Sequence, residues 1–290
     1  MKKRLFAVTD NKSRNANTGH SWDAIFKSIS FPEYCETLEY DDSADILDEI
    51  VSGFFRDVEV LDLGCGAGRF LYHLKRKGFK SLFGLDLSIE GLFKVRENVP
   101  GISLVQGDIS ALPYQDNRFD IILMVGIIYE IESQELHRRV MAEVSRVLKP
   151  GGVFIFVNNS PYNLGEKLFT VTQFFKKKEE GETSFFVWRF SRWDVKTLLK
   201  GTTLFIKRRV PCNFGTAVFR FFFGVFVRKS VRENRARNIR KINPYSLHEH
   251  YLANRDKSLF NFFGRMICWM RPFFKAIFYN TEVYEIRKKP

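Results

Sequence analysis

The chain has 290 residues, enough for one large domain or a domain with an appendage. Hydrophobic residues make up 45% of it, which fits a globular protein with a sizeable core. Its four cysteines lie far apart and form no CxxC pair. This spacing excludes a disulfide framework and a paired-cysteine zinc site, and it favours a reducing compartment. We expect no metal site. The cysteines are Cys35, Cys65, Cys212 and Cys268.

The sequence also bears on targeting. The basic start of the chain is followed by an apolar run too short for a signal peptide. No stretch approaches the roughly eighteen uncharged apolar residues that a membrane-spanning helix needs. We therefore expect a cytoplasmic protein.

The net charge of +13 is unevenly distributed. Residues 201–290 contain 19 lysines and arginines and 5 acidic residues, which gives a net charge of +14. Residues 1–200 contain 27 lysines and arginines and 28 acidic residues, which gives a net charge of −1. Thirteen of the 31 phenylalanines also lie in residues 201–290. A basic, aromatic appendage on a neutral core predicts a polyanionic partner or a membrane surface.

Two helices are predicted near the N-terminus, after a polar stretch at residues 1–20. Ser21 can cap the first helix, which includes Trp22. The second covers residues 45–51, and Gly53 marks its end. For Trp22 and Tyr34, packing against other side chains is favoured over contact with a ligand.

Strands and helices alternate regularly after these two helices. Such alternation of buried strands with helices predicts a doubly wound, mostly parallel sheet. Right-handed crossovers would bring the carboxyl ends of its strands to one edge, where ligands bind. The predicted strands are 58–63, 81–86, 102–105, 119–125 and 152–157, and the main helices are 69–77, 89–97 and 133–148.

A glycine-rich turn joins the first of these strands to the helix after it. Glycines stand at 64, 66 and 68. Glycine permits a positive φ and lets the backbone approach a ligand that a Cβ would block. This unit predicts a nucleotide-binding turn; the alternative is a tight turn that binds nothing. A nicotinamide dinucleotide is disfavoured, because Arg69 stands where the third glycine of G-x-G-x-x-G should be.

Acidic residues accompany the turn at two strand ends. Asp62 precedes the glycines, and Asp86 follows residues 81–85. With these carboxylates, DLGCGAGRF (62–70) and GLDLS (84–88) resemble the first motif and the ribose-binding acidic loop of class I S-adenosylmethionine-dependent methyltransferases. The resemblance implies S-adenosyl-L-methionine as the cofactor. The cofactor-binding positions that it implies here are Asp62, Gly64, Cys65, Gly66, Gly68, Asp86 and Leu87.

Two later segments extend the resemblance. Asp108 and Ile109 stand where the family holds the adenine, with the carboxylate accepting from the exocyclic amine and the apolar side chain packing on the ring. For Asp108 alone, a turn cap is an equally good interpretation. Val125 and Gly126 follow the predicted fourth strand and would face the methionine part of the cofactor.

The segment LKPGG at 148–152 matches the family's helix-turn-strand, with Pro150 and Gly151 ending the helix and turning the chain into the next strand. Ser191 caps a further helix, residues 202–210 read as a sixth strand, and 282–288 resembles the family's closing antiparallel strand. The fold class is therefore α/β, a Rossmann-like seven-stranded sheet with a helical basic insertion before the last strand. The predicted organisation is lid helices at 1–54, a cofactor-binding core at 55–211, a basic aromatic insertion at 212–280 and a closing strand at 281–290.

The catalytic residues stay unknown at this stage. Tyr129 and Glu130 occupy the place where many relatives have a Leu-His-His-like triplet, so a histidine base is missing there. Tyr129, Glu130 and His20 are candidates by location only, and a structural role is favoured for each.

Three interpretations of the 212–280 insertion stay open. Its helices could cap the sheet, lie on an anionic membrane surface, or bind RNA, in that order of preference. The function that the resemblance implies is methyl transfer from S-adenosylmethionine to a small-molecule or lipid-linked acceptor, as in quinone-type enzymes. The alternatives are an RNA methyltransferase and a non-catalytic cofactor-binding or membrane-associated module.

Overall fold

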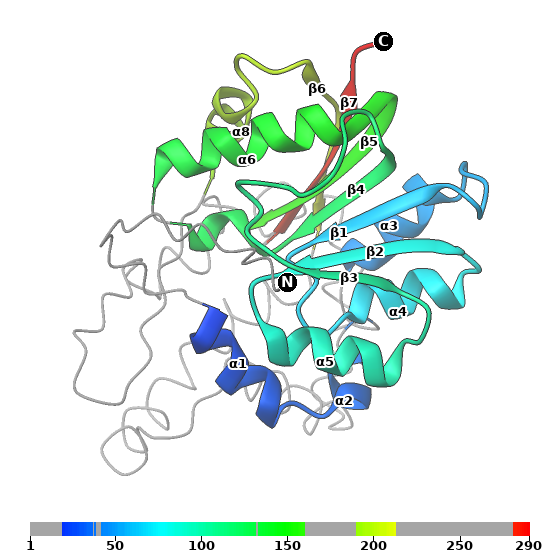
Figure 1. Cartoon of the computed structure of the whole chain (residues 1–290). Helices are drawn as coiled ribbons and strands as arrows, with labels where there is room; N and C mark the ends of the chain where they lie inside the picture. The colour runs from blue at the N-terminus through cyan, green and yellow to red at the C-terminus, as the bar shows by residue number, and fades with distance from the viewer. Residues whose placement is uncertain (1–18, 37, 39–41, 132, 160–189, 213–280) are drawn as a thin grey trace, which may run out of the picture.

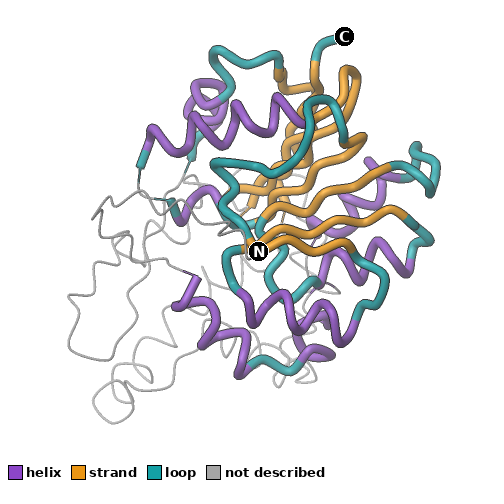
Figure 2. The backbone as a smooth tube through the Cα atoms, viewed as in Figure 1, coloured by secondary structure: helices purple, strands orange, loops and turns teal. Residues whose placement is uncertain are grey.

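The computed structural model describes residues 19–36, 38, 42–131, 133–159, 190–212 and 281–290. They form one seven-stranded sheet with helices on both faces (Figures 1 and 2). The strand order is β3-β2-β1-β4-β5-β7-β6. The strands are β1 (Glu59–Leu63), β2 (Ser81–Asp86), β3 (Ser103–Gln106), β4 (Phe119–Val125), β5 (Leu148–Asn159), β6 (Leu204–Cys212) and β7 (Thr281–Lys288).

The first five strands pair in parallel, and β7 lies antiparallel between β5 and β6. This arrangement confirms the predicted α/β fold, including the antiparallel strand at the end of the chain. Because β1 lies at the centre of the parallel part, the loops after β1, β2 and β4 leave the sheet side by side. These are the loops that carry the predicted cofactor residues.

The helices connect the strands as expected, with small differences in their bounds. Ser88, Ser133 and Ser191 accept backbone N–H groups at the starts of α5, α6 and α8, and at Ser191 the predicted cap is a full capping box. The helices are α1 (Gly19–Ser28), α2 (Phe31–Glu36), α3 (Asp42–Val51), α4 (Arg69–Arg76), α5 (Ile89–Asn98), α6 (Gln134–Val147) and α8 (Arg192–Leu198), with a 3-10 turn η2 (Ile128–Glu130).

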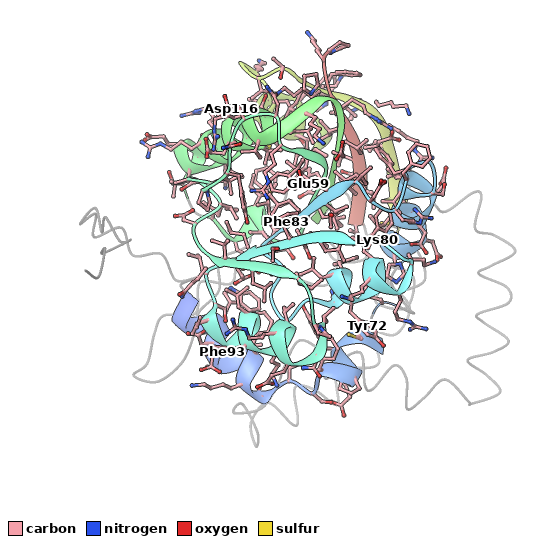
Figure 3. All side chains as sticks on the ribbon, turned by 45° about the vertical axis from the view of Figure 1, so that its right-hand side comes forward. Glu59, Tyr72, Lys80, Phe83, Phe93 and Asp116 are labelled. Atoms are coloured by element: carbon pink, nitrogen blue, oxygen red, sulfur yellow. The ribbon has the colours of Figure 1, made fainter. Side chains whose placement is uncertain are left out.

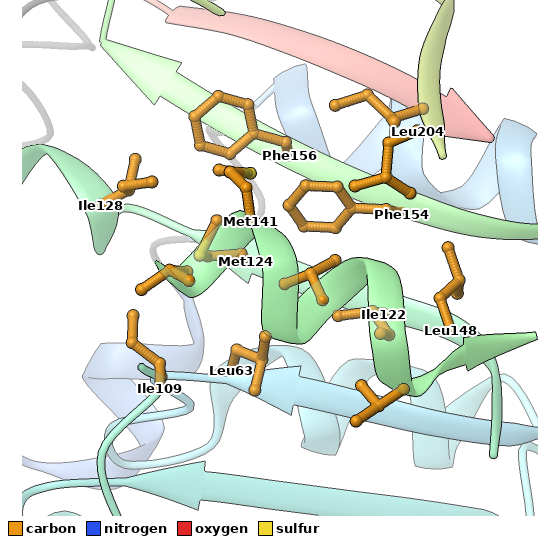
Figure 4. Packing of buried hydrophobic residues seen from close by; sticks show 14 of the residues in the cluster. Leu63, Ile109, Ile122, Met124, Ile128, Met141, Leu148, Phe154, Phe156 and Leu204 are labelled. Carbon is orange, nitrogen blue, oxygen red and sulfur yellow. The ribbon is translucent and has the colours of Figure 1, made fainter. Parts of the chain in front are cut away.

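The core occupies both faces of the sheet, because successive residues of a strand point to opposite sides. On β4, Ile122 and Met124 pack with α6 and α8 on one side. Ile121 and Leu123 pack with α3, α4 and α5 on the other. Figure 4 shows the first side, where Met141 of α6 lies beside the phenylalanines of β5. Figure 3 shows Phe93 at the outer surface of α5, away from both clusters.

Two local predictions were wrong. The helix α1 begins at Gly19, so Ser21 lies inside it and does not cap it. The helix α6 ends at Val147, and Pro150 and Gly151 already belong to β5. Leu148 pairs with β4, and the register then shifts before regular pairing resumes. The Pro-Gly pair therefore forms an irregularity within the strand, where Gly151 adopts a φ of 75°.

The predicted basic insertion at 212–280 lies outside the described residues apart from Cys212, which ends β6. Its capping, membrane and RNA interpretations stay predictions. Within the described ranges, no helix combines the length and the apolar character needed to cross a bilayer.

Candidate cofactor-binding site

The loop between β1 and α4 has the backbone conformation that its glycines predicted. Gly64, Gly66 and Gly68 adopt φ angles of 69°, 53° and 85°. Non-glycine residues seldom adopt such angles, so the loop path requires glycine. The N–H of Gly64 donates to the carbonyl of Leu85 at 2.7 Å, which ties the loop to the end of β2.

The space beside these glycines is taken by the protein itself. A Cβ at Gly66 would lie 2.7 Å from Cζ of Phe26, and one at Gly68 would lie 2.6 Å from the side chain of Val95. At Gly64 the collision would be with Ile127. Packing against these side chains therefore favours glycine at all three positions, and the expected approach of the backbone to a ligand stays a prediction. The cofactor-binding role of the loop stays a prediction.

Asp86 points into this loop. One of its carboxylate oxygens accepts the N–H of Gly66 and the other accepts the N–H of Ser88, both at 2.7 Å. Burial raises the pKa of Asp86. The backbone N–H groups of Ser88, Gly66 and Leu87 oppose the rise because they stabilise the charged form, whereas the Asp23 carboxylate adds to it. Each carboxylate oxygen keeps a further lone pair, which can accept from a hydroxyl group of a bound ligand.

Asp62 interrupts the otherwise apolar, buried strand β1. Its side chain is 2% exposed, and no donor among the described residues forms a hydrogen bond with it. Burial raises the pKa of Asp62 to about 7; the Asp86 carboxylate adds to the rise and Arg69 opposes it. Because a charged carboxylate is costly to bury, this position can accept a cationic or hydrogen-bonding ligand.

The turn after β4 brings two of the catalytic candidates to the same edge of the sheet. Gly126 adopts a φ of 79°, and a Cβ there would lie 2.9 Å from the hydroxyl of Tyr129. Glu130, the last residue of η2, is half-buried. Burial raises the pKa of Glu130 to about 8, a hydrogen bond from Trp22 opposes the rise, and the Asp86 carboxylate adds to it. Glu130 therefore lies within electrostatic reach of the ribose-binding candidate.

The helix α1 lies over the start of α5 (Figure 1). Asp23 accepts from the hydroxyl of Ser88 at 2.6 Å and from the N–H of Glu90 at 3.2 Å. The ring of Trp22 stacks on Phe26, with centroids 5.6 Å apart. Sequence reasoning missed Asp23, and for Trp22 it favoured packing over contact with a ligand. The available signal was an acidic residue beside a tryptophan on a predicted lid helix.

The other predicted residues are more dispersed. Asp108 is exposed, and its carboxylate accepts the N–H of Ser110 at 2.7 Å, which is the turn-cap alternative. Ile109 is buried in the core, whereas Leu87 is 48% exposed. Cys65 is a buried free thiol, and burial raises its pKa.

Two predicted residues remain to be placed. Val125 is half-buried at the end of β4. His20 belongs to α1, but its side chain lies outside the described residues. Among the described residues, no group of three or more His, Cys, Asp or Glu side chains could hold a metal ion.

These features fit S-adenosylmethionine. Its sulfonium and ammonium groups are cations, and its ribose hydroxyl groups are donors. At the buried edge of the sheet, neither Asp62 nor Asp86 forms an ion pair with another described residue, and the Arg69 charge only partly opposes the effect of burial on the pKa of Asp62. The sheet order and this loop together define a Rossmann-like domain of the class I methyltransferase type.

Comparison with known proteins identifies the same family. Residues 61–156 match the model of a methyltransferase domain. The chain is 38% identical over 120 residues to a fatty-acid O-methyltransferase of Mycolicibacterium smegmatis, which covers 38% of this chain and 42% of that protein. It is 37% identical over 111 residues to a phthiotriol/phenolphthiotriol dimycocerosates methyltransferase of Mycobacterium tuberculosis, covering 36% and 39%. The chain thus spans about two fifths of the length of these curated relatives.

The crystal structure of the PH0226 protein from Pyrococcus horikoshii OT3 has a similar fold. It is 26% identical, covers 65% of this chain and 88% of its own, and superposes with a TM-score of 0.51. Residues 61–156 of the present chain belong to the class I S-adenosylmethionine-dependent methyltransferases, and S-adenosylmethionine is the cofactor that this family implies.

Proposed function

We propose that the chain transfers a methyl group from S-adenosylmethionine to a small-molecule or lipid-linked acceptor. The observation that carries the proposal is the contact between the glycine loop and Asp86. This carboxylate accepts the N–H of Gly66 at 2.7 Å, beside the buried Asp62. The match of residues 61–156 to the methyltransferase domain supports the same conclusion.

The residues of the chain have separate tasks in this proposal. When bound, the cofactor supplies a methyl group that its sulfonium already activates. The protein must therefore orient the donor and the acceptor, exclude water from the site, and accept a proton where the acceptor carries one. Asp86 and the glycine loop orient the ribose and the amino-acid part. The aromatic side chains of Trp22 and Phe26 on α1 exclude water. Glu130 is the carboxylate that we assign to proton acceptance, because it follows the β4 turn at the same edge of the sheet.

The acceptor class rests on the relatives. One is named for a fatty acid and the other for phthiotriol and phenolphthiotriol dimycocerosates, and both similarities cover under half of those proteins. The chain resembles them over its cofactor-binding part, which supports the donor more strongly than the acceptor. A lipid-like acceptor also agrees with the many phenylalanines of residues 201–290.

Two assays test the proposal. S-adenosylhomocysteine should raise the melting temperature of the protein whereas NAD leaves it unchanged; the reverse pattern would remove the cofactor assignment. Radiolabelled S-adenosylmethionine should then transfer its label to a component of a total lipid extract. Binding without transfer to any lipid or small-molecule pool would instead favour a non-catalytic cofactor-binding module.

We further propose that the protein is cytoplasmic and reaches its acceptor at an anionic membrane surface through residues 212–280. The excess positive charge of residues 201–290 supports this proposal, since basic segments with aromatic residues are attracted to anionic lipids. The protein should float with vesicles of phosphatidylglycerol and phosphatidylcholine but not with phosphatidylcholine alone. Retention on RNA without vesicle binding would support the RNA alternative instead.

A further inference from the structure

The exposed face of α8 combines an aromatic ring with cations. Trp193 is 57% exposed, although tryptophan is largely buried in most folded proteins. The centroid of its ring lies 4.8 Å from Cζ of Arg192 and 4.9 Å from Nζ of Lys196. The turn after the helix adds Lys200, which is also exposed. We call these residues the α8 patch. The opposite face of α8 is buried beside α6 (Figure 1), so the patch is the face that the helix presents to solvent.

The cations of the α8 patch have no acidic partner. The one acidic residue of α8 is Asp194, and its carboxylate accepts the N–H of Ser191 at 2.8 Å in the capping box. Among the described residues, no carboxylate forms an ion pair with Arg192, Lys196 or Lys200. Cations that no carboxylate neutralises can form charge-assisted hydrogen bonds with phosphate groups. The patch is therefore suited to a polyanionic surface.

The start of α8 lies at the edge of the sheet that holds the proposed cofactor site. The carbonyl of Phe190 accepts from Nδ2 of Asn158 at 2.8 Å, at the carboxyl end of β5. The ring of Phe190 also meets His137 edge to face, with centroids 5.2 Å apart. Nε2 of His137 lies 2.7 Å from the carbonyl of Ile131, the residue directly after Glu130. Two contacts thus link the start of α8 to the turn that carries the assigned proton acceptor.

We propose that the α8 patch docks on an anionic lipid bilayer, with the indole of Trp193 in the interfacial layer and the cations on lipid phosphates. Tryptophan is enriched at membrane interfaces, and lysine and arginine near the surface are attracted to anionic leaflets. The inference rests on the proposed function, because it gives a lipid-linked acceptor an entry point beside Glu130. Unlike the membrane contact proposed for residues 212–280, it is carried by described residues of the core.

The shape of the patch favours a bilayer over a single-stranded nucleic acid. Proteins that bind single strands use a positively charged groove in which aromatic side chains stack on successive bases. The α8 patch is the outer surface of a short helix, and Trp193 is its one aromatic residue. A bilayer surface can meet such a helix along its length, whereas a strand would find one ring for stacking.

Flotation of the full chain with vesicles of phosphatidylglycerol and phosphatidylcholine tests the cations. Lys196→Glu should weaken vesicle binding on the order of tenfold, because it replaces a cation at the lipid surface by an anion. Lys80→Glu is the matched control, because Lys80 is exposed and directly precedes β2 at the opposite edge of the sheet (Figure 3). The control makes the same change in net charge and should bind within about twofold of the wild type, since salt screens distant charges.

Two measurements test the aromatic ring. Trp193→Ala should weaken vesicle binding on the order of tenfold, since it removes apolar surface that enters the interface. Phe55→Ala is its control, because Phe55 is 83% exposed between α3 and β1, at the opposite edge of the sheet. Vesicles with brominated acyl chains should also quench the fluorescence of the wild type more strongly than that of Trp193→Phe. Equal quenching would overturn the inference, because it would mean that the indole of Trp193 stays outside the bilayer.

Calorimetry with S-adenosylhomocysteine separates the inference from the proposed function. Every variant should bind this ligand as the wild type does, because the α8 patch lies outside the loops after β1 and β2, and unchanged affinity also shows that the variant is folded. If the wild type binds the ligand but does not float with the vesicles, the inference is overturned and the cofactor assignment stands. If the wild type floats through the α8 patch but does not bind the ligand, the proposed function fails and the docking surface stands.

Two further results would overturn the inference. Equal losses of vesicle binding in Lys196→Glu and Lys80→Glu would mean that net charge alone drives the association. Loss of retention on RNA in Lys196→Glu and Trp193→Ala, with unchanged flotation, would assign the patch to a nucleic acid.

Discussion

Replacing Asp62 by asparagine should change how the stability of the ligand-free protein depends on pH. The carboxyl group is buried within β1, and burial raises its pKa from 3.8 to about 7. A raised pKa means that the folded state holds the proton more tightly than the unfolded chain. The stabilising contribution is therefore complete below about pH 4 and is lost as the pH rises through about 7.

The magnitude follows from the same two values. The difference between 3.8 and about 7 corresponds to about 4 kcal/mol, at about 1.4 kcal/mol for each pH unit. Asparagine has nearly the shape of the protonated aspartate and does not titrate. The wild type should therefore lose up to about 3 kcal/mol relative to Asp62→Asn between pH 4.5 and pH 8, because part of the full difference is already lost at pH 4.5; this is an upper value, since relaxation and water entry lower it.

Urea unfolding of both proteins across this pH range measures the difference. Titration of all other groups is common to the two chains and cancels in the comparison. Glu135→Gln, at an exposed site, should track the wild type within a few tenths of a kcal/mol. A constant difference between wild type and Asp62→Asn from pH 4.5 to 8 would refute the reasoning, because it would mean that Asp62 is charged throughout.

Three further substitutions probe the loop and the helices around it. Gly66→Ala should lower the free energy of unfolding in urea by about 2 kcal/mol, because φ is 53° and the new Cβ would lie 2.7 Å from Phe26. The control Gly53→Ala, with open space beside the new Cβ, should cost less than half as much. Equal costs would contradict the packing argument. Ser191→Ala removes the capping box of α8 and should cost about 1 kcal/mol; no loss would mean that the box contributes nothing. Asp23→Ala frees α1 from α5 and should weaken S-adenosylhomocysteine binding about tenfold, by calorimetry, and unchanged affinity would exclude a lid role.

Much of the fold could be predicted because its signals are local. The apolar runs of β1 and β4 can only be buried, and the helices between them show clear periodicity. The antiparallel β7 was predicted from its alternation together with its resemblance to the closing strand of the family. Glu282 and Glu285 on it are buried against basic partners on β6. Such long-range pairs complete a sheet whose strands the sequence already marks.

The boundaries that failed depend on tertiary contacts. The helix α6 stops at Val147 because Leu148 pairs with Phe119 of β4, a long-range bond that competes with the helix. Pro150 then stands inside the strand next to a register shift, where its missing N–H is tolerated. Helix propensity alone places the stop at the proline.

The positive φ angles of the loop glycines were predicted, whereas the side chains that pack beside these glycines were not. Asp62 and Asp86 could be found because charged residues seldom interrupt buried strands without a function or a partner. The side chains that pack against these glycines could not be predicted, because Phe26 and Ile127 are distant from the loop in sequence and only folding brings them to it. The bond from Trp22 to Glu130 escaped for the same reason.

A crystal structure of the protein grown with saturating S-adenosylhomocysteine tests the central claim most directly. We predict density for the ligand at the loop after β1, with its ribose hydroxyl groups bonded to Asp86 and its amino-acid part beside the loop at Gly64–Gly68. Ligand density at another place would contradict the assignment of this edge of the sheet to the methyl donor. So would a structure without ligand density here, in which Phe26 and Ile127 still pack against the glycine loop.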